Sequence, residues 1–507
     1  MERFVVAALI LLFGGAAFAE SIEDDPRVQL GLVPVDVMRG SRLFFEETFA
    51  GNGRTCGTCH VAEDNLQIEL ATVRALPQDA PFFAKNVPGL EQPGMIQRGL
   101  ILENVDGFAN QPMFRSTPHM LSLSTSIHSN VDVPAGTDTV GWGGDGAPAP
   151  GTLRDFARGA VTQHFTRSLA RVPGVDFRLP TAGEEEALLA FQMSLGRTAD
   201  ISLANVRFND PQAERGRSGP QAFLDSVGNN CQRCHGDGGA SRGANGGGPE
   251  VINGIVTGNQ NKDTNIDAMR VPTAPHDDGR GFPGDETFSP PPLIEAADTA
   301  PFFHIGSADI DLEGAVRFYT VRGVGGNGPG LFSGAQQAFD EQMTQDIGAV
   351  LRSLNASLNA QMAIQRIEAA NLIALTFPDH PSIGELLDLA AEEAEDGARV
   401  LTSPGASKAK AELSSCASLA DRAANKNKPV HHLRMIESAR VACETANASL
   451  GTGLTMQMGA GNLAMRSASF RPRHDADDDE GPGNGQGGNG NGNGSNRGEG
   501  QGNGNGD

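Results

Sequence analysis

Tyrosine and tryptophan are almost absent from this 507-residue chain, which contains one of each, and only six cysteines occur. Basic residues are also scarce: 39 Lys and Arg stand against 62 Asp and Glu, and the formal net charge is −23. Because nucleic acid binds through an excess of positive charge, this balance argues against a nucleic-acid-binding protein. The length is sufficient for two or three domains with hydrophobic cores.

Long apolar runs are missing beyond the first nineteen residues, so no later segment is expected to span a bilayer. The opening MERFVVAALILLFGGAAFA has a charged start, an apolar centre and a small-residue ending at Ala19. This pattern is typical of a secretory signal peptide, residues 1–19. A retained membrane anchor is the alternative, for which the run is short. We predict a periplasmic protein, cleaved near Ala19 and not stably inserted in a membrane.

Four of the six cysteines lie in two Cys-x-x-Cys-His motifs. The motifs consist of Cys56, Cys59 and His60, and of Cys231, Cys234 and His235. This spacing is the attachment signature of c-type haem, in which two thioethers hold the haem edge and the histidine reaches the iron. A zinc site would need further ligands nearby, and a redox dithiol has no use for the adjacent histidine. The sequence therefore predicts two covalently bound haems.

Two halves of the chain resemble each other around these motifs. GSRLF and GRSGPQAF precede the motifs, RSTP and RVP follow them, and LRDFARGAV and LEGAVRFY share helical apolar spacing. LLAFQMSL and IGAVLRSL are the predicted closing helices, and Gly-, Pro- and Asp-rich loops lie between. The repeat predicts a mainly α fold with two tandem cytochrome c-like haem domains, at residues 30–205 and 206–357.

The C-terminal third differs from both halves. Residues 358–470 are rich in Ala, Leu and Glu and are predicted to be helical, and Cys416 and Cys443 can join two helices through a disulfide. Residues 471–507 have almost no apolar side chains, which predicts a disordered Gly/Asn-rich tail. A calcium-binding Gly/Asp repeat is the alternative, but its nine-residue pattern is absent.

Residues 36–357 resemble the bacterial di-haem cytochrome c peroxidase superfamily, which includes the MauG-type enzymes. TAPFFHIG at 299–306 and LEGAVRFY at 312–319 are similar to the family's TAPYFHDG…LEEAVRFY segment, and GWGGDG at 141–146 to its WDGR turn. The resemblance implies an oxidoreductase whose first, peroxidatic haem reacts with hydrogen peroxide. It also implies a second, electron-transfer haem and a redox partner protein as electron donor.

Two aromatic residues stand at positions that matter in this family. Tyr319 replaces the methionine that binds the second haem in the peroxidases, and MauG-type enzymes have an axial tyrosine there. The resemblance thus implies a phenolate ligand, which favours Fe(III); packing on the porphyrin is the alternative. Trp142 matches a tryptophan between the haems that can relay electrons, with a buried aromatic spacer as the alternative.

The peroxide side of the first haem departs from the family. The family's catalytic glutamate has no counterpart in GAVTQHF at 159–165. His164 is therefore the candidate acid/base. It could instead bind the iron and close the site, or lie at the surface or beside a haem propionate. His119 and His128 are further candidates for the distal side.

Other candidates also follow from the resemblance. Arg115 and Arg270 lie in the two matching turns, where an arginine fork suits a haem propionate; a solvated surface position is the alternative. His304 is expected to form hydrogen bonds or face a propionate rather than bind iron. Thr299 and Pro301 match positions whose backbone carbonyls help to hold calcium, although the family's asparagine from the first domain has no clear match.

Two rival interpretations remain at this point. In one, the chain is a non-catalytic di-haem electron carrier, with His164 or His119 filling the first iron site. In the other it is a haem-bearing binding module, and residues 358–470 dock a partner.

Overall fold

The computed structural model describes the following residues: 21–126, 133–134, 153–219, 222–224, 231, 235–239, 251–252, 255–256, 266, 274–279, 283–284, 286, 288, 291–306, 310–321, 341–424 and 429–466. The predicted signal peptide and C-terminal tail lie outside them, and so do Trp142, Cys234, Arg270 and His128. Tyr319 belongs to a helix, but its side chain is outside the described part.

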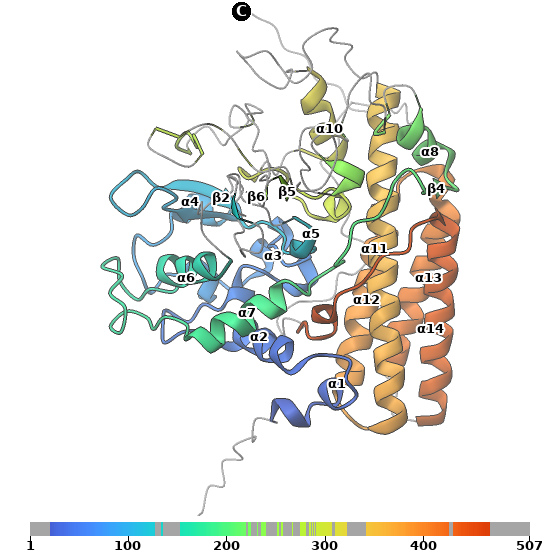
Figure 1. Ribbon diagram of the computed structural model, residues 1–507, viewed down its shortest axis with the longest axis horizontal. Helices are drawn as coiled ribbons and strands as arrows, with labels where there is room; N and C mark the ends of the chain where they lie inside the picture. The colour runs from blue at the N-terminus through green and yellow to red at the C-terminus, as the bar shows by residue number, and fades with distance from the viewer. Residues whose placement is uncertain are drawn as a thin grey trace, which may run out of the picture. The chain divides into compact units, whose positions relative to one another are not determined.

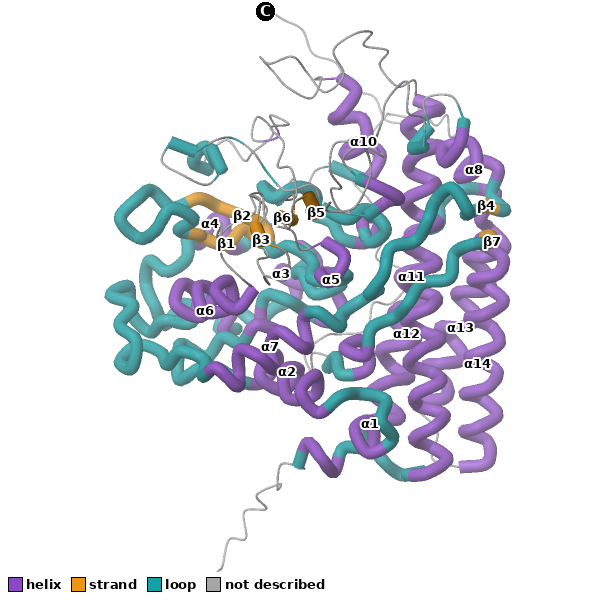
Figure 2. Tube along the Cα trace, in the orientation of Figure 1, coloured by secondary structure: helices purple, strands orange, loops and turns teal. Residues whose placement is uncertain are grey.

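The fold is mainly helical, as predicted, with a few very short strands (Figures 1 and 2). The helices are α1 (Pro26–Gln29), α2 (Val35–Glu46), α3 (Leu70–Ala75), α4 (Pro93–Ile96), α5 (Leu123–Ser126), α6 (Leu153–His164), α7 (Ala182–Gln192), α8 (Pro211–Ser218), α10 (Leu312–Val321), α11 (Glu341–Thr376), α12 (Ser382–Val400), α13 (Ser407–Ala424) and α14 (Pro429–Leu450). The strands are β1 (Leu100–Glu103), β2 (Met113–Ser116), β3 (Val133–Pro134), β4 (Arg207–Phe208), β5 (Val251–Ile252), β6 (Ile255–Val256) and β7 (Gly451–Thr452). None of the described helices is both long and apolar enough to cross a membrane.

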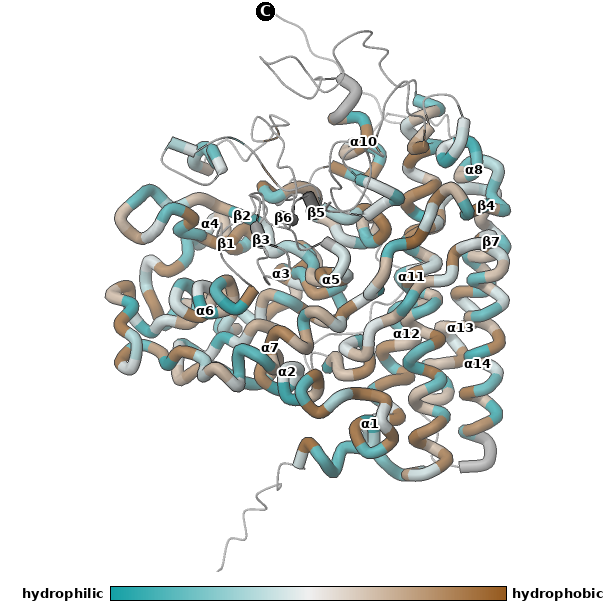
Figure 3. Tube along the Cα trace, in the orientation of Figure 1, coloured by the Kyte–Doolittle hydropathy of each residue, from teal (hydrophilic) through white to brown (hydrophobic). Residues whose placement is uncertain are grey.

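Four long helices, α11 to α14, pack side by side as a bundle in which each contacts the next and α14 returns to α11 (Figure 1). Hydrophobic and hydrophilic residues alternate along them in Figure 3, as in helices with one buried face. Cys416 of α13 and Cys443 of α14 are fully buried and form a disulfide, which confirms this pairing. The predicted helical character of the C-terminal region is also confirmed.

The first half is closed by a crossing of α2 and α7. α7 begins at a capping box, because the Thr181 N–H donates to Glu184 at 2.8 Å and the Glu184 N–H donates to Thr181 at 3.3 Å. At the crossing a Cβ on Gly40 of α2 would lie 2.0 Å from the Ala187 carbonyl oxygen. The two backbones approach so closely that only glycine fits there.

The second half repeats this crossing with α8 and α11. α8 begins at Pro211 with the Asp210 side chain as its cap, which accepts from the Gln212 N–H at 2.9 Å. A Cβ on Gly216 of α8 would lie 2.0 Å from the Asp346 carbonyl oxygen of α11. Gly40 and Gly216 open the two halves of the sequence repeat, so the repeat has a matching geometry at both places.

Two further helices complete this correspondence. The two similar segments are helical, as predicted. α6 packs against α7, and α10 packs against α11, so they take matching places in the two halves. The predicted boundary at residue 357, however, falls inside α11, which continues without a break to Thr376. One helix therefore closes the second half and also opens the bundle.

The segment after the bundle contacts both halves. β7 pairs with β4 at the start of the second half, and the Thr198 N–H donates to the Gln457 carbonyl at 2.7 Å. Farther along, the Leu463 carbonyl accepts a hydrogen bond from buried Arg27 at 3.2 Å. The described residues up to 466 accordingly belong to one compact unit.

The two glycine crossings can be tested by adding one methyl group. Gly40→Ala and Gly216→Ala should each lower the free energy of unfolding by roughly 1–3 kcal/mol, because the new Cβ meets a backbone carbonyl that cannot move aside. Gly159→Ala in α6 is the matched control, since nothing lies within 4 Å of its Cβ position. It should be neutral or stabilising by about 0.5–1 kcal/mol. Denaturant titration measures all three, and equal effects would contradict the close crossings.

Candidate functional site

The first Cys-x-x-Cys-His motif winds into a single tight turn that packs against α2. The Thr55 N–H donates to the Thr58 hydroxyl at 2.9 Å, and the His60 N–H donates to the Cys56 carbonyl at 3.0 Å. These local bonds place both thiols and the imidazole on one turn, which is the arrangement that attachment of one haem requires.

The backbone fixes the ring of His60. Its Nδ1 lies 2.6 Å from the Leu66 carbonyl oxygen, which accepts a hydrogen bond and so assigns the ring proton to Nδ1. Burial lowers the pKa of His60 to about 4, although the Leu66 and Pro118 carbonyls oppose this shift. The imidazole is therefore neutral at pH 7. Fixing Nδ1 in this way leaves Nε2 as the nitrogen that suits a metal ion.

His235 of the second motif has the same environment. Its Nδ1 lies 2.9 Å from the Pro291 carbonyl oxygen, and burial lowers its pKa to about 4 against the effect of that carbonyl. Its N–H donates to the Cys231 carbonyl at 2.8 Å, as that of His60 does to Cys56. Two histidines that are far apart in the sequence thus have the same tautomer and the same charge state. Each also makes the same backbone hydrogen bond to the first cysteine of its own motif.

The thiols of the first motif are unsuited to dithiol redox chemistry. Burial raises the pKa of Cys56 to about 12 and that of Cys59 to about 11, whereas a reactive dithiol depends on a lowered thiol pKa. Across the described ranges, no group of three or more His, Cys, Asp or Glu side chains is placed to hold a metal ion. A covalently attached haem fits these residues best.

A fully buried arginine, Arg54, lies just before this motif. It pairs with Glu91 at 2.8 Å and donates to the Pro81 carbonyl at 3.1 Å and to the Phe82 carbonyl. The other Glu91 oxygen accepts from the Leu102 N–H at 3.0 Å. Sequence reasoning missed Arg54 and Glu91, because a single charged residue in a polar loop carries no signal of burial.

His164 ends α6 close to the first motif. Its carbonyl accepts from the Asn52 amide at 2.9 Å and from Arg54 at 3.4 Å. The pKa of His164 is lowered to about 3, first by burial and then by electrostatic interaction with Arg54, Arg171 and His60. The structure therefore places His164 within electrostatic reach of His60 and keeps its ring neutral.

The ring nitrogens of His164 differ in their surroundings. Nε2 lies 3.3 Å from the Gln163 amide nitrogen, while Nδ1 is buried and has no hydrogen-bond partner among the described residues. The Gln163 oxygen accepts from the Asn104 N–H at 3.1 Å. These contacts argue against a solvated surface position and leave an imidazole nitrogen available to a further group.

Arg115 lies in β2 and is buried, which excludes the solvated alternative. Its fork donates to both oxygens of Asp277, at 2.9 and 3.0 Å. Burial raises the pKa of Asp277, but the Arg115 charge outweighs this effect and leaves it lowered. His304 stacks on Phe288 with 3.7 Å between ring centroids, and its Nε2 lies 3.7 Å from Asp277. The fork predicted to face a haem propionate thus holds a carboxylate of the chain.

Thr299 and Pro301, the predicted calcium-binding positions, lie in a loop whose neighbouring carbonyls accept hydrogen bonds from side chains of the first half. The Gln67 amide donates to the intervening Ala300 carbonyl at 2.8 Å, and the Asn65 amide donates to the carbonyl just before Thr299 at 3.4 Å. An asparagine from the first half therefore lies beside this loop. Calcium binding itself stays a prediction.

Arg197 and Glu295 form a fully buried ion pair at 2.9 Å that joins the two halves. Ser122 donates to the same Glu295 oxygen at 2.6 Å, and Arg197 also pairs with Asp200 at 2.8 Å. Burial lowers the pKa of nearby His119, with Glu295 opposing the shift and Arg197 adding to it. Sequence reasoning identified His119 but none of the charged groups around it.

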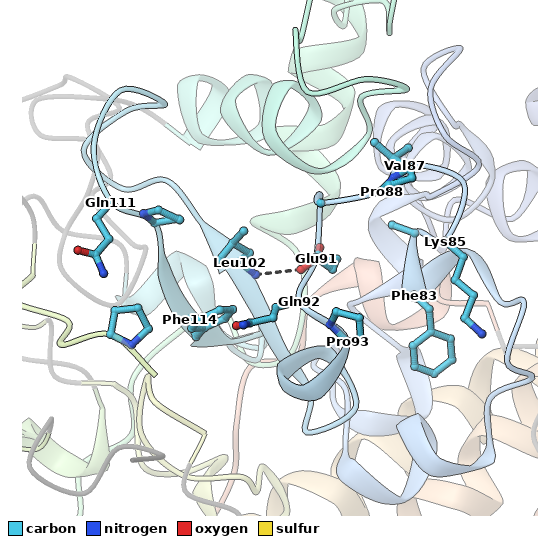
Figure 4. A pocket seen from close by; sticks show the side chains of 14 residues that line it. Phe83, Lys85, Val87, Pro88, Glu91, Gln92, Pro93, Leu102, Gln111 and Phe114 are labelled. Carbon is cyan, nitrogen blue, oxygen red and sulfur yellow. Dashed lines mark hydrogen bonds between the residues drawn. The ribbon is translucent and has the colours of Figure 1, made fainter. Parts of the chain in front are cut away.

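A cavity of about 660 Å³ lies between the segment that leads into α4 and the strands β1 and β2 (Figure 4). Its lining is mainly apolar and consists of Phe83, Ala84, Lys85, Val87, Pro88, Gly89, Glu91, Gln92, Pro93, Leu102, Gln111, Pro112, Phe114 and Pro275. The hydrogen bond between Glu91 and the Leu102 N–H crosses it in Figure 4. Phe83 of this lining belongs to the hydrophobic cluster against which Cys59 packs.

Comparisons with protein-family models, with curated proteins and with solved structures find no match for this chain. The functional interpretation therefore rests on the residues themselves.

The buried pair between the halves should carry a large part of the stability. Glu295→Gln leaves the Arg197 guanidinium in a fully buried position with Asp200 as its remaining carboxylate partner, so the free energy of unfolding should fall by about 3 kcal/mol. Glu437→Gln is the control, because Glu437 pairs with Arg440 on the exposed side of α14 and should cost less than about 1 kcal/mol. Denaturant titration measures the free energy of unfolding of both variants. Equal decreases would show that the buried pair stabilises the fold no more than the exposed pair does.

Proposed function

We propose that the chain is a periplasmic oxidoreductase that carries two covalently attached c-type haems and reacts with hydrogen peroxide. The strongest support is that the histidines of the two motifs have the same environment. Each of His60 and His235 closes the turn of its motif through an N–H bond to the first cysteine carbonyl. Each imidazole is neutral and donates Nδ1–H to a backbone carbonyl. Each turn belongs to a half that is closed by a helix crossing at glycine.

Cys56 and Cys59 would hold the first haem through thioether bonds, and His60 would bind its iron. Cys231 and Cys234 would hold the second haem in the same way, and His235 would bind its iron. A bound haem supplies one-electron redox chemistry and, where its iron has an open position, a place for peroxide. The chain supplies orientation, because carbonyls fix both imidazoles. It also supplies neutral ligands, because burial disfavours protonation.

Protons must move as peroxide is reduced, since one hydrogen peroxide takes up two electrons and two protons and yields two waters. We assign the transfer of a proton between the peroxide oxygens to His164. Its neutral ring can accept a proton and return it, and its buried Nδ1 has no partner within the described part of the chain. This assignment places a histidine where the family has a carboxylate.

The remaining roles rest on the resemblance. Trp142 relays electrons between the haems, Tyr319 binds the second iron, and Arg270 faces a propionate. The Arg115 fork is occupied by Asp277 and has no such role here. Thr299 and Pro301 help to hold calcium. If Tyr319 is a ligand, oxidation of a protein or organic substrate becomes the favoured reaction, because an anionic phenolate stabilises oxidised iron.

A non-catalytic electron carrier is the second candidate. The electron-carrier function is favoured by the buried Nδ1 of His164, which has no hydrogen-bond partner among the described residues and could bind the first iron instead of moving protons. The spectroscopic experiment below separates the two candidates.

Haem attachment is the first test. The exported protein should contain two haems that remain bound after denaturation, because thioether bonds survive unfolding. Replacing Cys56 and Cys59 by Ala should leave one haem, and the same change at Cys231 and Cys234 should leave the other. Haem content per chain and intact mass measure the outcome. A protein that loses all colour on denaturation contradicts covalent attachment.

Ferric EPR and optical spectra, recorded before and after addition of peroxide, are the second test. We expect one high-spin haem and a spectral change with peroxide. In His164→Ala the peroxide reaction should slow by about 10²–10⁴-fold, and the spin state of the first haem should not change.

Conversion of a low-spin to a high-spin signal in this variant would show that His164 binds the first iron. Tyr319→Phe should alter the low-spin signal of the second haem. Two low-spin haems that stay inert to peroxide, even after partial reduction, would overturn the enzyme proposal.

A further inference from the structure

An exposed apolar loop follows α6 directly. Of the eight large hydrophobic side chains found exposed among the described residues, four lie between positions 169 and 179, and a fifth is bridged to this loop by an arginine. They are Leu169 (49% exposed), Val172 (44%), Val175 (62%), Leu179 (37%) and Phe108 (50%). We refer to residues 166–179 with Phe108 as the loop face. A gathering of this kind marks an interaction surface, whereas scattered apolar side chains do not.

The loop is held in shape by its own hydrogen bonds. The buried Asp176 accepts from the Val172 N–H at 2.8 Å through its side chain and from the Arg167 N–H at 3.2 Å through its carbonyl. The Gly174 N–H donates to the Phe177 carbonyl at 2.7 Å. These bonds keep the apolar side chains in water, so the loop face does not cover itself by folding inward.

Two arginines of the loop, Arg167 and Arg171, differ from the third in their partners. Arg178 pairs with Glu184 at 2.8 Å and Glu47 at 3.1 Å. Arg167 and Arg171 instead donate to backbone carbonyls, and Arg171 lies 4.2 Å above the Phe108 ring. Neither forms an ion pair with a carboxylate in the described part of the chain. On a protein with a net charge of −23, this face is locally cationic.

The loop face is tied to the first motif through Asn52. The Asn52 side chain donates to the His164 carbonyl at 2.9 Å and to the Thr166 carbonyl at 3.0 Å. Its own oxygen accepts from the Arg54 N–H at 3.1 Å, two residues before Cys56. A protein bound at this face would therefore lie next to the segment that leads into the first haem attachment turn.

We propose that the loop face docks a redox partner protein whose contact surface is apolar at its centre and carries carboxylates on its rim. The inference rests on the proposed function and names where its electron donor binds. One electron would pass from the reduced donor, which is oxidised, to the ferric first haem, which is reduced. In this proposal the donor's electron enters at the first haem and reaches the second haem only from there. Small contact surfaces are typical of such transient complexes.

The test measures electron transfer without peroxide. The probe is a reduced, acidic mono-haem cytochrome c, mixed in a stopped-flow instrument with the ferric full-length protein at low and high salt. Arg171→Glu should lower the second-order rate constant at least about tenfold at low salt, and the difference should shrink at high salt as charges are screened. Val175→Ser should lower it about threefold at either salt concentration.

Matched controls lie on the bundle. Lys408→Glu on α13 changes the net charge by the same amount at a side chain that is 76% exposed, and Val441→Ser removes an apolar side chain that is 47% exposed on α14. Both should leave the rate constant within about twofold of the unchanged protein. Folding and haem content of every variant are checked by circular dichroism and absorbance.

Several outcomes would overturn the docking surface. If Arg171→Glu and Lys408→Glu lowered the rate constant equally, the effect would come from the net charge of the protein and not from the loop face. Binding to anionic phospholipid vesicles that is lost in Val175→Ser would assign the face to a membrane surface, and a dimer that dissociates in the same variant would assign it to a second copy. NMR titration of the donor detects docking without electron transfer, so loss of peroxide chemistry alone leaves this inference standing.

Discussion

The crossing of two helices at a glycine is the constraint on which each half of this protein depends. At Gly40 and Gly216 the backbones come so close that a methyl group would strike a carbonyl oxygen. In the first half the crossing sets α2 in place, and the turn of the first motif packs on that helix. The ring of Phe44 then lies 5.9 Å from the ring of His60, which brings the histidine into the core. Burial makes the imidazole neutral, and a backbone carbonyl fixes its direction.

Local patterns explain what the sequence could predict. α6 and α10 have helical apolar spacing, the bundle is rich in helix-forming residues, and its two cysteines are the pair left over from the motifs. The same reasoning could not place the end of the second half, because α11 has no capping signal near residue 357 and simply continues. The boundary at residue 357 was predicted from the internal repeat. A repeat cannot indicate that its last helix continues into another region.

The charged groups around the sites could not be predicted for a different reason. Arg115 is 162 residues from Asp277, and Arg197 is 98 residues from Glu295. No local pattern marks such partners, since a buried ion pair and two solvated surface residues look alike in a sequence. The motifs identify the expected ligands, and only the fold reveals how deeply the groups around them are buried.

The continuity of α11 has a consequence for how the molecule unfolds. α8 and α10 pack on the first part of this helix, and α12 and α14 pack along it within the bundle. Since a helix loses its hydrogen bonds cooperatively, fraying that begins in the bundle would propagate toward the crossing at Gly216. We expect the second half and the bundle to behave as one foldon, with amide hydrogens on both sides of residue 357 exchanging together. An intact bundle then becomes a condition for keeping the second Cys-x-x-Cys-His motif in place.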